Sequence, residues 1–118
     1  MIISDVISLL KAQVLSENID YNQQIKTACG SDMMSDVLRY IKQDSILLTG
    51  LTNLQVIRTA EMLDIVCLIF VRGKKPAPEM LKKAEELGIS VLSTELAMFE
   101  ACGILYNAGL RGGTRFDD

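Results

Sequence analysis

The sequence predicts an α/β fold, a three-layer α/β/α sandwich with a mostly parallel sheet. From residue 23 onward, four strand-like segments alternate with four segments of helical periodicity. Residues 65–71 are apolar without a break, which is typical of a strand buried on both faces of a parallel sheet. With 118 residues, 49% of them hydrophobic, the chain can bury one core. Right-handed crossovers are expected to place helices on both faces of the sheet.

The first segments have the least regular pattern. Ser4 and Asp5 are suited to cap a short helix over residues 6–11, and a short strand is expected at 13–15. After a polar loop, residues 23–29 alternate imperfectly between two faces. This pattern favours a strand near the edge of the sheet.

A second helix is expected after the break at residues 30–32, and it extends to about residue 41. The apolar stripe of this helix is expected to consist of Met33, Met34, Val37, Leu38 and Ile41. Residues 45–49, which are apolar at their three central positions, are expected to form a short buried strand.

The third helix follows the turn at residues 50–53, where Asn53 is a good N-terminal cap. It is expected to end near residue 63, and its inward-facing residues are expected to be Leu54, Ile57 and Ala60. The strand at 65–71 then leads into a basic loop.

The fourth helix begins near Pro78, since proline suits the first helical turn. Gly88 is expected to end this helix in a left-handed conformation, and a strand follows at 89–92. We expect a single domain over residues 1–110 and a flexible, glycine-rich tail over residues 111–118.

A final helix, capped by Ser93 or Thr94, is expected to extend to about residue 108. It is apolar almost all round, whereas a helix that covers one face of a sheet needs only an apolar stripe. The second apolar side therefore predicts a homodimer interface. Its candidate contacts are Met98, Phe99, Cys102 and Tyr106. The alternative is that other elements of the same chain cover this side.

Composition excludes several kinds of site. The chain has no histidine, which removes His-based catalytic groups and His-ligated metal sites. Its three cysteines lack C-x-x-C spacing, which argues against a zinc site. Its net charge of −3 argues against binding to nucleic-acid phosphates. No apolar run is long enough to cross a membrane. We expect no metal, no cofactor, no catalytic residues and no nucleic-acid or membrane partner. Free thiols and the lack of a signal peptide favour a cytoplasmic location.

Polar segments that follow the predicted strands are expected to converge at one edge of the sheet. Ligands of parallel sheets bind beyond the carboxyl ends of the strands, close to helix N-termini. This arrangement suits a small anionic ligand. The candidate ligand-binding residues are Ser31, Asp32, Thr49, Gly50, Thr52, Asn53, Arg72, Ser93 and Thr94. The alternative is that these residues only cap helices and form turns.

Several segments give the chain a family resemblance. Residues 31–38 and 47–61, supported by residues 71–76 and 92–103, resemble a stand-alone DRTGG-domain protein. The motif that names this family is not present in literal form. The turn at residues 49–53 occupies the corresponding place, with leucine at a position that is charged in the family.

Such domains are similar to the N-terminal domain of HPr kinase/phosphorylase and to a regulatory domain of some phosphotransacetylases, and they accompany CBS domains in some proteins. The resemblance implies an α/β/α fold and a regulatory module of the bacterial cytoplasm. It implies no kinase activity, because the kinase domain of HPr kinase has no counterpart in this chain.

Three functions remain open. The first is a non-catalytic regulatory homodimer that senses a small anionic or nucleotide-like ligand at the strand ends. The second is a protein-interaction module without a small ligand, whose partner is a kinase or a redox enzyme. The third is an uncharacterised enzyme, for which Cys29 is the best candidate nucleophile.

Overall fold

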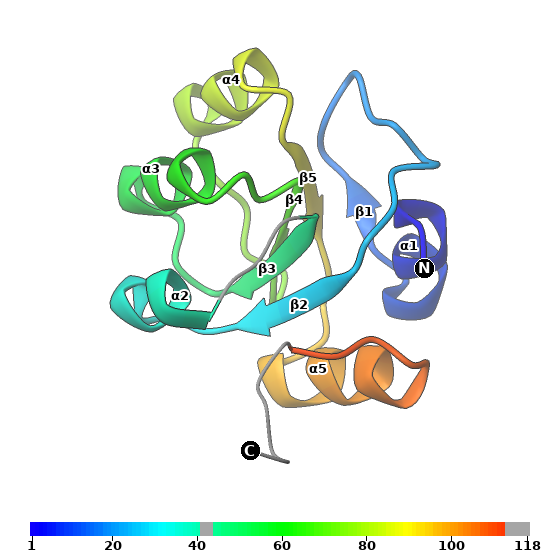
Figure 1. Cartoon of the computed structure of the whole chain (residues 1–118). Helices are drawn as coiled ribbons and strands as arrows, with labels where there is room; N and C mark the ends of the chain where they lie inside the picture. Colours follow the sequence, from blue (N-terminus) through cyan, green and yellow to red (C-terminus); the bar gives the residue numbers. More distant parts are fainter. Residues whose placement is uncertain (41–43, 113–118) are drawn as a thin grey trace.

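The computed structural model describes residues 1–40 and 44–112, and within these residues a five-stranded sheet has the order β1-β5-β4-β3-β2 (Figure 1). The strands β2 to β5 are parallel to one another, and β1 is antiparallel to β5. The predicted mostly parallel sheet is therefore confirmed. The strands are β1 (Gln13–Val14), β2 (Thr27–Gly30), β3 (Ser45–Thr49), β4 (Cys67–Phe70) and β5 (Ser90–Ser93).

Helices cover both faces of the sheet, which confirms the three-layer sandwich (Figure 1). The helices of the described residues are α1 (Ile3–Leu10), α2 (Met34–Tyr40), α3 (Leu54–Met62), α4 (Pro78–Glu86) and α5 (Met98–Asn107). We expected crossover helices on both faces, but α2, α3 and α4 all pack on one face. The strands β2 to β5 are neighbours in chain order, so each right-handed crossover passes over the same side. The helices α1 and α5 cover the other face.

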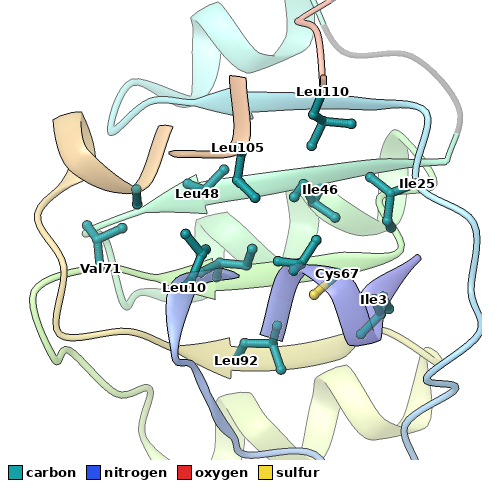
Figure 2. Close-up of a cluster of buried hydrophobic side chains, with 13 residues drawn as sticks. Ile3, Leu10, Ile25, Ile46, Leu48, Cys67, Val71, Leu92, Leu105 and Leu110 are labelled. Atoms are coloured by element: carbon teal, nitrogen blue, oxygen red, sulfur yellow. The ribbon is translucent and has the colours of Figure 1, made fainter. Parts of the chain in front are cut away.

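Each strand divides its side chains between two cores. Ile46 and Leu48 of β3 and Leu92 of β5 point toward α1 and α5, and Leu105 of α5 points toward the sheet (Figure 2). Leu47, between the first two, packs toward α2, α3 and α4 instead. Because both faces are covered, β3, β4 and β5 are buried at every position.

The helices are rotated differently from the sequence prediction at three apolar positions. Met34 and Val37 of α2 are buried, but Met33 is 60% exposed and Leu38 is 47% exposed. Met33 lies before the first residue of α2. Leu38 follows the buried Val37 directly, and the rotation of the helix carries it away from the core. Ile41, which the prediction also placed in this stripe, lies outside the described residues.

The third helix shows the same kind of difference. Ile57 and Ala60 face inward as predicted, but Leu54 is 52% exposed and Val56 takes its place in the core. Asn53 caps this helix as predicted, accepting a hydrogen bond from the N–H of Gln55 at 3.0 Å.

The ends of the other helices partly match the sequence prediction. Pro78 occupies the first turn of α4, and Gly88 follows it with a φ of 73°, both as predicted. The first helix starts at Ile3, earlier than predicted. Asp5 does not precede it as a cap but accepts a hydrogen bond from the N–H of Ile2 from inside the first turn.

The predicted cap of the last helix is wrong. Ser93 is the last residue of β5, and α5 begins at Met98 without a side-chain cap. Thr94 is buried, and its hydroxyl donates to the carbonyl of Leu10 at 2.8 Å and accepts from the N–H of Leu96. This residue therefore ties the end of α1 to the end of β5.

The chain stays attached to the sheet beyond α5. Leu110 is buried, and the carbonyl of Arg111 accepts a hydrogen bond from the N–H of Ala28 at 3.0 Å. The guanidinium of Arg111 lies 4.0 Å from the centre of the Tyr106 ring and donates to the Tyr106 carbonyl. Residues 113–118 of the predicted tail lie outside the described residues.

Replacing Thr94 tests its role in joining α1 to β5. We expect Thr94→Val to lower the free energy of unfolding by about 1–2 kcal/mol, because the buried Leu10 carbonyl loses its donor. Thr94→Ser keeps the hydroxyl and serves as the control, with a smaller loss. Urea denaturation measures both. Equal stability of the valine variant and the wild type would contradict this role.

Candidate functional site

A cleft of about 410 Å³ lies at the carboxyl ends of the parallel strands. The ends of β2 and β4 form one side and the start of α5 forms the other, so the arrowhead of β2 lies near α5 in Figure 1. The cleft is lined by Gly30, Ser31, Asp32, Val71, Arg72, Ala97, Met98 and Phe99. This edge is where parallel sheets usually hold their ligands.

The carboxylate of Asp32 joins the segment after β2 to the end of β3. One oxygen, Oδ1, accepts the hydroxyl of Thr49 at 3.1 Å and the N–H of Gly50 at 2.7 Å. Thr49 is fully buried, and its own oxygen accepts the N–H of Leu51. These bonds fix the carboxylate, and its second oxygen, Oδ2, has no protein donor within residues 1–40 and 44–112.

A tight turn after β4 presents Arg72. Arg72 and Gly73 both have positive φ, 57° and 69°, and the N–H of Lys74 donates to the carbonyl of Val71 at 3.2 Å. The N–H of Arg72 donates to the Leu96 carbonyl at 2.8 Å, which ties the turn to the segment before α5. The left-handed conformation costs an arginine about 1–2 kcal/mol, a strain that clusters at functional sites.

The charged groups of Arg72 and Asp32 meet over Gly50. A Cβ atom on Gly50 would lie 2.9 Å from Nη2 of Arg72 and 3.4 and 3.5 Å from the two carboxylate oxygens of Asp32. The two groups are nevertheless not an ion pair, and no other described residue pairs with the guanidinium. Gly50 therefore leaves room for an arginine that has no protein partner in the described parts of the chain.

The opposite wall of the cleft is apolar and belongs to the start of α5. Phe99 is 85% exposed, and Met98 is half-buried against the core. A Cβ atom on Gly30 would lie 2.6 Å from the sulfur of Cys102, so only glycine lets α5 approach β2 this closely. Because Ala97 offers no side-chain cap, the first N–H groups of α5 are left for other acceptors.

The structure gathers some of the sequence-predicted site residues and separates others. Ser31, Asp32 and Arg72 line the cleft, while Thr49 and Gly50 lie behind Asp32. The hydroxyl of Ser31 also donates to the Met33 carbonyl and accepts its N–H.

Besides Thr49 and Gly50, four more of the candidates do not line the cleft. Asn53 caps α3, and Thr52 belongs to the same turn. Ser93 is buried and donates to the carbonyl of Lys74, and Thr94 is bonded to Leu10. The side chains of Asn53, Ser93 and Thr94 thus bond to backbone groups.

Sequence reasoning missed the apolar wall. It assigned Met98 and Phe99 to a dimer surface and did not consider Ala97 or Val71. The missing signal was the true start of α5: the predicted cap at Ser93 or Thr94 placed the start of the helix too early, whereas α5 begins at Met98, and its start lines the cleft.

The thiols do not have the character of reactive nucleophiles. Burial, together with the nearby Cys102 thiol and Asp36 carboxylate, raises the pKa of the Cys29 thiol. Burial also raises the pKa of the Cys102 thiol. A raised pKa keeps a thiol protonated at neutral pH, and the protonated form is a poor nucleophile.

The described residues contain neither a metal-binding cluster nor a membrane-spanning helix. Within residues 1–40 and 44–112, no group of three or more acidic or cysteine side chains is placed to hold a metal ion. Over the same residues, no helix is both long enough and apolar enough to span a bilayer.

These features define a small α/β/α domain with an open, charged cleft at the carboxyl edge of its parallel sheet. The chain belongs to the DRTGG domain family, whose model matches residues 5–108. The predicted family resemblance is therefore confirmed. A comparison with curated protein sequences finds no match.

A solved structure has the same fold. It contains the CBS and DRTGG domains of the regulatory region of Clostridium perfringens pyrophosphatase, complexed with the activator diadenosine tetraphosphate. The match has a TM-score of 0.72 at 18% identity and covers 96% of this chain. The present chain spans 50% of the length of that chain.

The bonds of Asp32 can be tested by stability. We expect Asp32→Ala to lower the free energy of unfolding by about 1–2 kcal/mol, because it leaves the buried hydroxyl of Thr49 without an acceptor. Asp32→Asn keeps an oxygen at Oδ1 and should stay within about 0.5 kcal/mol of the wild type. Chemical denaturation of both variants measures the difference, and equal losses would refute the bonding scheme.

Proposed function

We propose that this protein is a non-catalytic regulatory module that senses a small anionic ligand in the cleft between the strand ends and α5. One observation carries the proposal: Arg72 lies in a strained turn at the cleft, and its guanidinium has no partner among the described residues. A strained, unpaired cation at this edge of a parallel sheet is best explained by an external anion. Membership of the DRTGG family and the regulatory neighbour support a regulatory role.

The residues of the cleft have separate roles in this proposal. Arg72 binds the anion through its guanidinium, and the free N–H groups in the first turn of α5 add a favourable dipole. Asp32, held by Thr49 and Gly50, sets the polar side of the cleft, while the hydroxyl of Ser31 is bonded to the backbone of Met33.

The ligand would act by shifting a conformational equilibrium. One wall of the cleft is the first turn of α5, and the outer side of the same helix exposes Phe99 and Tyr106. Suppose that α5 can take two placements relative to the sheet. A ligand that binds more tightly to the domain in one placement increases the population of that placement. This shift in the placement of α5 would also move its exposed side chains, to which a partner protein can bind.

We propose the bacterial cytoplasm as the compartment of this protein. Cys29, Cys67 and Cys102 are all free thiols, which favours a reducing compartment such as the bacterial cytoplasm.

A ligand screen by thermal unfolding tests the proposal. The panel contains nucleotides, acyl phosphates, sugar phosphates and carboxylates. A ligand present at 100 times its dissociation constant should stabilise the fold by roughly 2.7 kcal/mol. Arg72→Asn should abolish this stabilisation, and asparagine tolerates the left-handed turn.

Lys75→Asn is the matched control, since Lys75 is an exposed cation of the same loop that does not line the cleft. Stabilisation that survives Arg72→Asn, or a panel in which no compound stabilises the wild type, would contradict the proposal.

The outer face of α5 supports self-association as a second property. Phe99 is 85% exposed and Tyr106 is 55% exposed on the same helix. Met98 and Cys102, the other predicted contacts, are half-buried and pack partly against the core. The proposed dimer contact is therefore centred on Phe99 and Tyr106, and a kinase or a redox enzyme is the alternative partner for this face.

Sedimentation equilibrium measures the oligomeric state. We expect twice the monomer mass of 13.0 kDa at micromolar concentration, and the monomer mass for Tyr106→Asp, which adds a charge away from the cleft. Met62→Asp is the control, because Met62 is 69% exposed on α3. A monomeric wild type would overturn self-association and leave the face to a different protein.

A further inference from the structure

We propose that the ligand of this cleft is an α-amino acid with an apolar side chain, whose ammonium group binds Asp32 and whose carboxylate binds Arg72. This inference rests on the proposed function: the carboxylate of the amino acid is the anionic group that Arg72 binds, and the ammonium group is a second, additional contact.

The charges of the cleft favour a ligand that carries both signs. Among the described residues that line it, Asp32 is the acid and Arg72 the base, and they do not pair with each other. A phosphate bound to Arg72 alone would bring its negative charges close to the fixed carboxylate of Asp32, which is unfavourable. A zwitterion instead places a cation beside Asp32 and an anion beside Arg72.

The spacing of the two groups favours a short ligand. Nη2 of Arg72 and both oxygens of Asp32 lie within 3.5 Å of one point, the position of a Cβ atom on Gly50. The amine and the carboxylate of an α-amino acid are attached to one carbon atom, so they match two protein groups that lie this close together. In a nucleotide, the phosphate and the sugar hydroxyls are separated by several bonds, and the match is poorer.

The carboxylate of Asp32 is prepared to accept a cation. Oδ1 is occupied by the donors of Thr49 and Gly50, and Oδ2 has no protein donor in the described segments. An ammonium group is a donor without acceptor capacity, so it fits the side of the carboxylate that remains open. The guanidinium of Arg72 matches a carboxylate through two parallel N–H donors.

The apolar wall of the cleft is the reason for proposing a ligand with an apolar side chain. Ala97, Met98 and Phe99 contribute apolar surface, and the volume of about 410 Å³ lies at the small end of ligand sites. Leucine, methionine or phenylalanine would place their side chains against this wall.

Calorimetric titration tests the inference with L-leucine, L-methionine and L-phenylalanine as probes. We expect at least one of them to bind the wild type. Asp32→Asn, which keeps the bonds of Oδ1, should weaken this binding about tenfold to a hundredfold, and Arg72→Asn should weaken it at least as much. Asp36→Asn is the control, since Asp36 is an exposed acid of α2 outside the cleft, and it should bind as the wild type does.

Two analogues of the bound amino acid separate the roles of the two groups. The amide removes the carboxylate, and it should bind poorly to the wild type and lose nothing further in Arg72→Asn. The α-hydroxy acid removes the ammonium, and it should bind more weakly than the amino acid and be insensitive to Asp32→Asn.

The outcomes distinguish this inference from the proposed function. If a phosphate compound binds in an Arg72-dependent way and none of the amino acids does, the amino-acid inference is overturned while the anion site stands. If the amino acids bind to Asp32→Asn and to Arg72→Asn as strongly as they bind to the wild type, the inference is overturned. If neither amino acids nor the anions of the wider panel bind, both proposals are overturned.

Discussion

The carboxylate of Asp32 is the contact on which the cleft depends. It lies just after β2 and accepts two donors from the end of β3, the buried hydroxyl of Thr49 and the N–H of Gly50. These bonds hold the segments that follow two neighbouring strands in register with each other. They also orient the carboxylate toward the guanidinium of Arg72, which reaches over Gly50 from the end of the next strand. Three strand ends thus contribute to one charged surface.

The order of the strands decides which helix closes this surface. Because β2 to β5 are parallel neighbours in chain order, the helices α2 to α4 all fall on one face and leave the other to α1 and α5. The last helix therefore begins at the carboxyl edge of the sheet, and its first turn becomes the apolar wall of the cleft. The same helix exposes Phe99 and Tyr106 on its outer side, so a single element joins the ligand site to the surface.

Much of the fold follows from apolar periodicity. The unbroken apolar runs around Leu47 and Ile69 indicate strands that are buried on both faces. Asn53 and Pro78 indicate where helices begin, and Gly88, which adopts a positive φ, indicates where a helix ends. Helix rotation is less predictable, as the exposed Leu54 shows, because an apolar residue in the first turn can lie outside the buried stripe. In the site, Asp32 and Arg72 follow from the rule for strand ends. Thr94 also follows a strand end, but its hydroxyl donates to the carbonyl of Leu10 instead of facing the cleft. Leu10 is far from Thr94 in the sequence, so the sequence alone does not indicate this bond.

Amide hydrogen exchange at Gly50 tests the central claim most directly, namely that the Asp32 carboxylate holds the strand ends together. The account predicts slow exchange of the Gly50 amide in the wild type and in Asp32→Asn, and fast exchange in Asp32→Ala, while the amides of Leu47 and Ile69 in the core strands stay protected. If the Gly50 amide exchanges equally fast in the wild type and in Asp32→Ala, the carboxylate does not hold this edge, and the account of the cleft is contradicted.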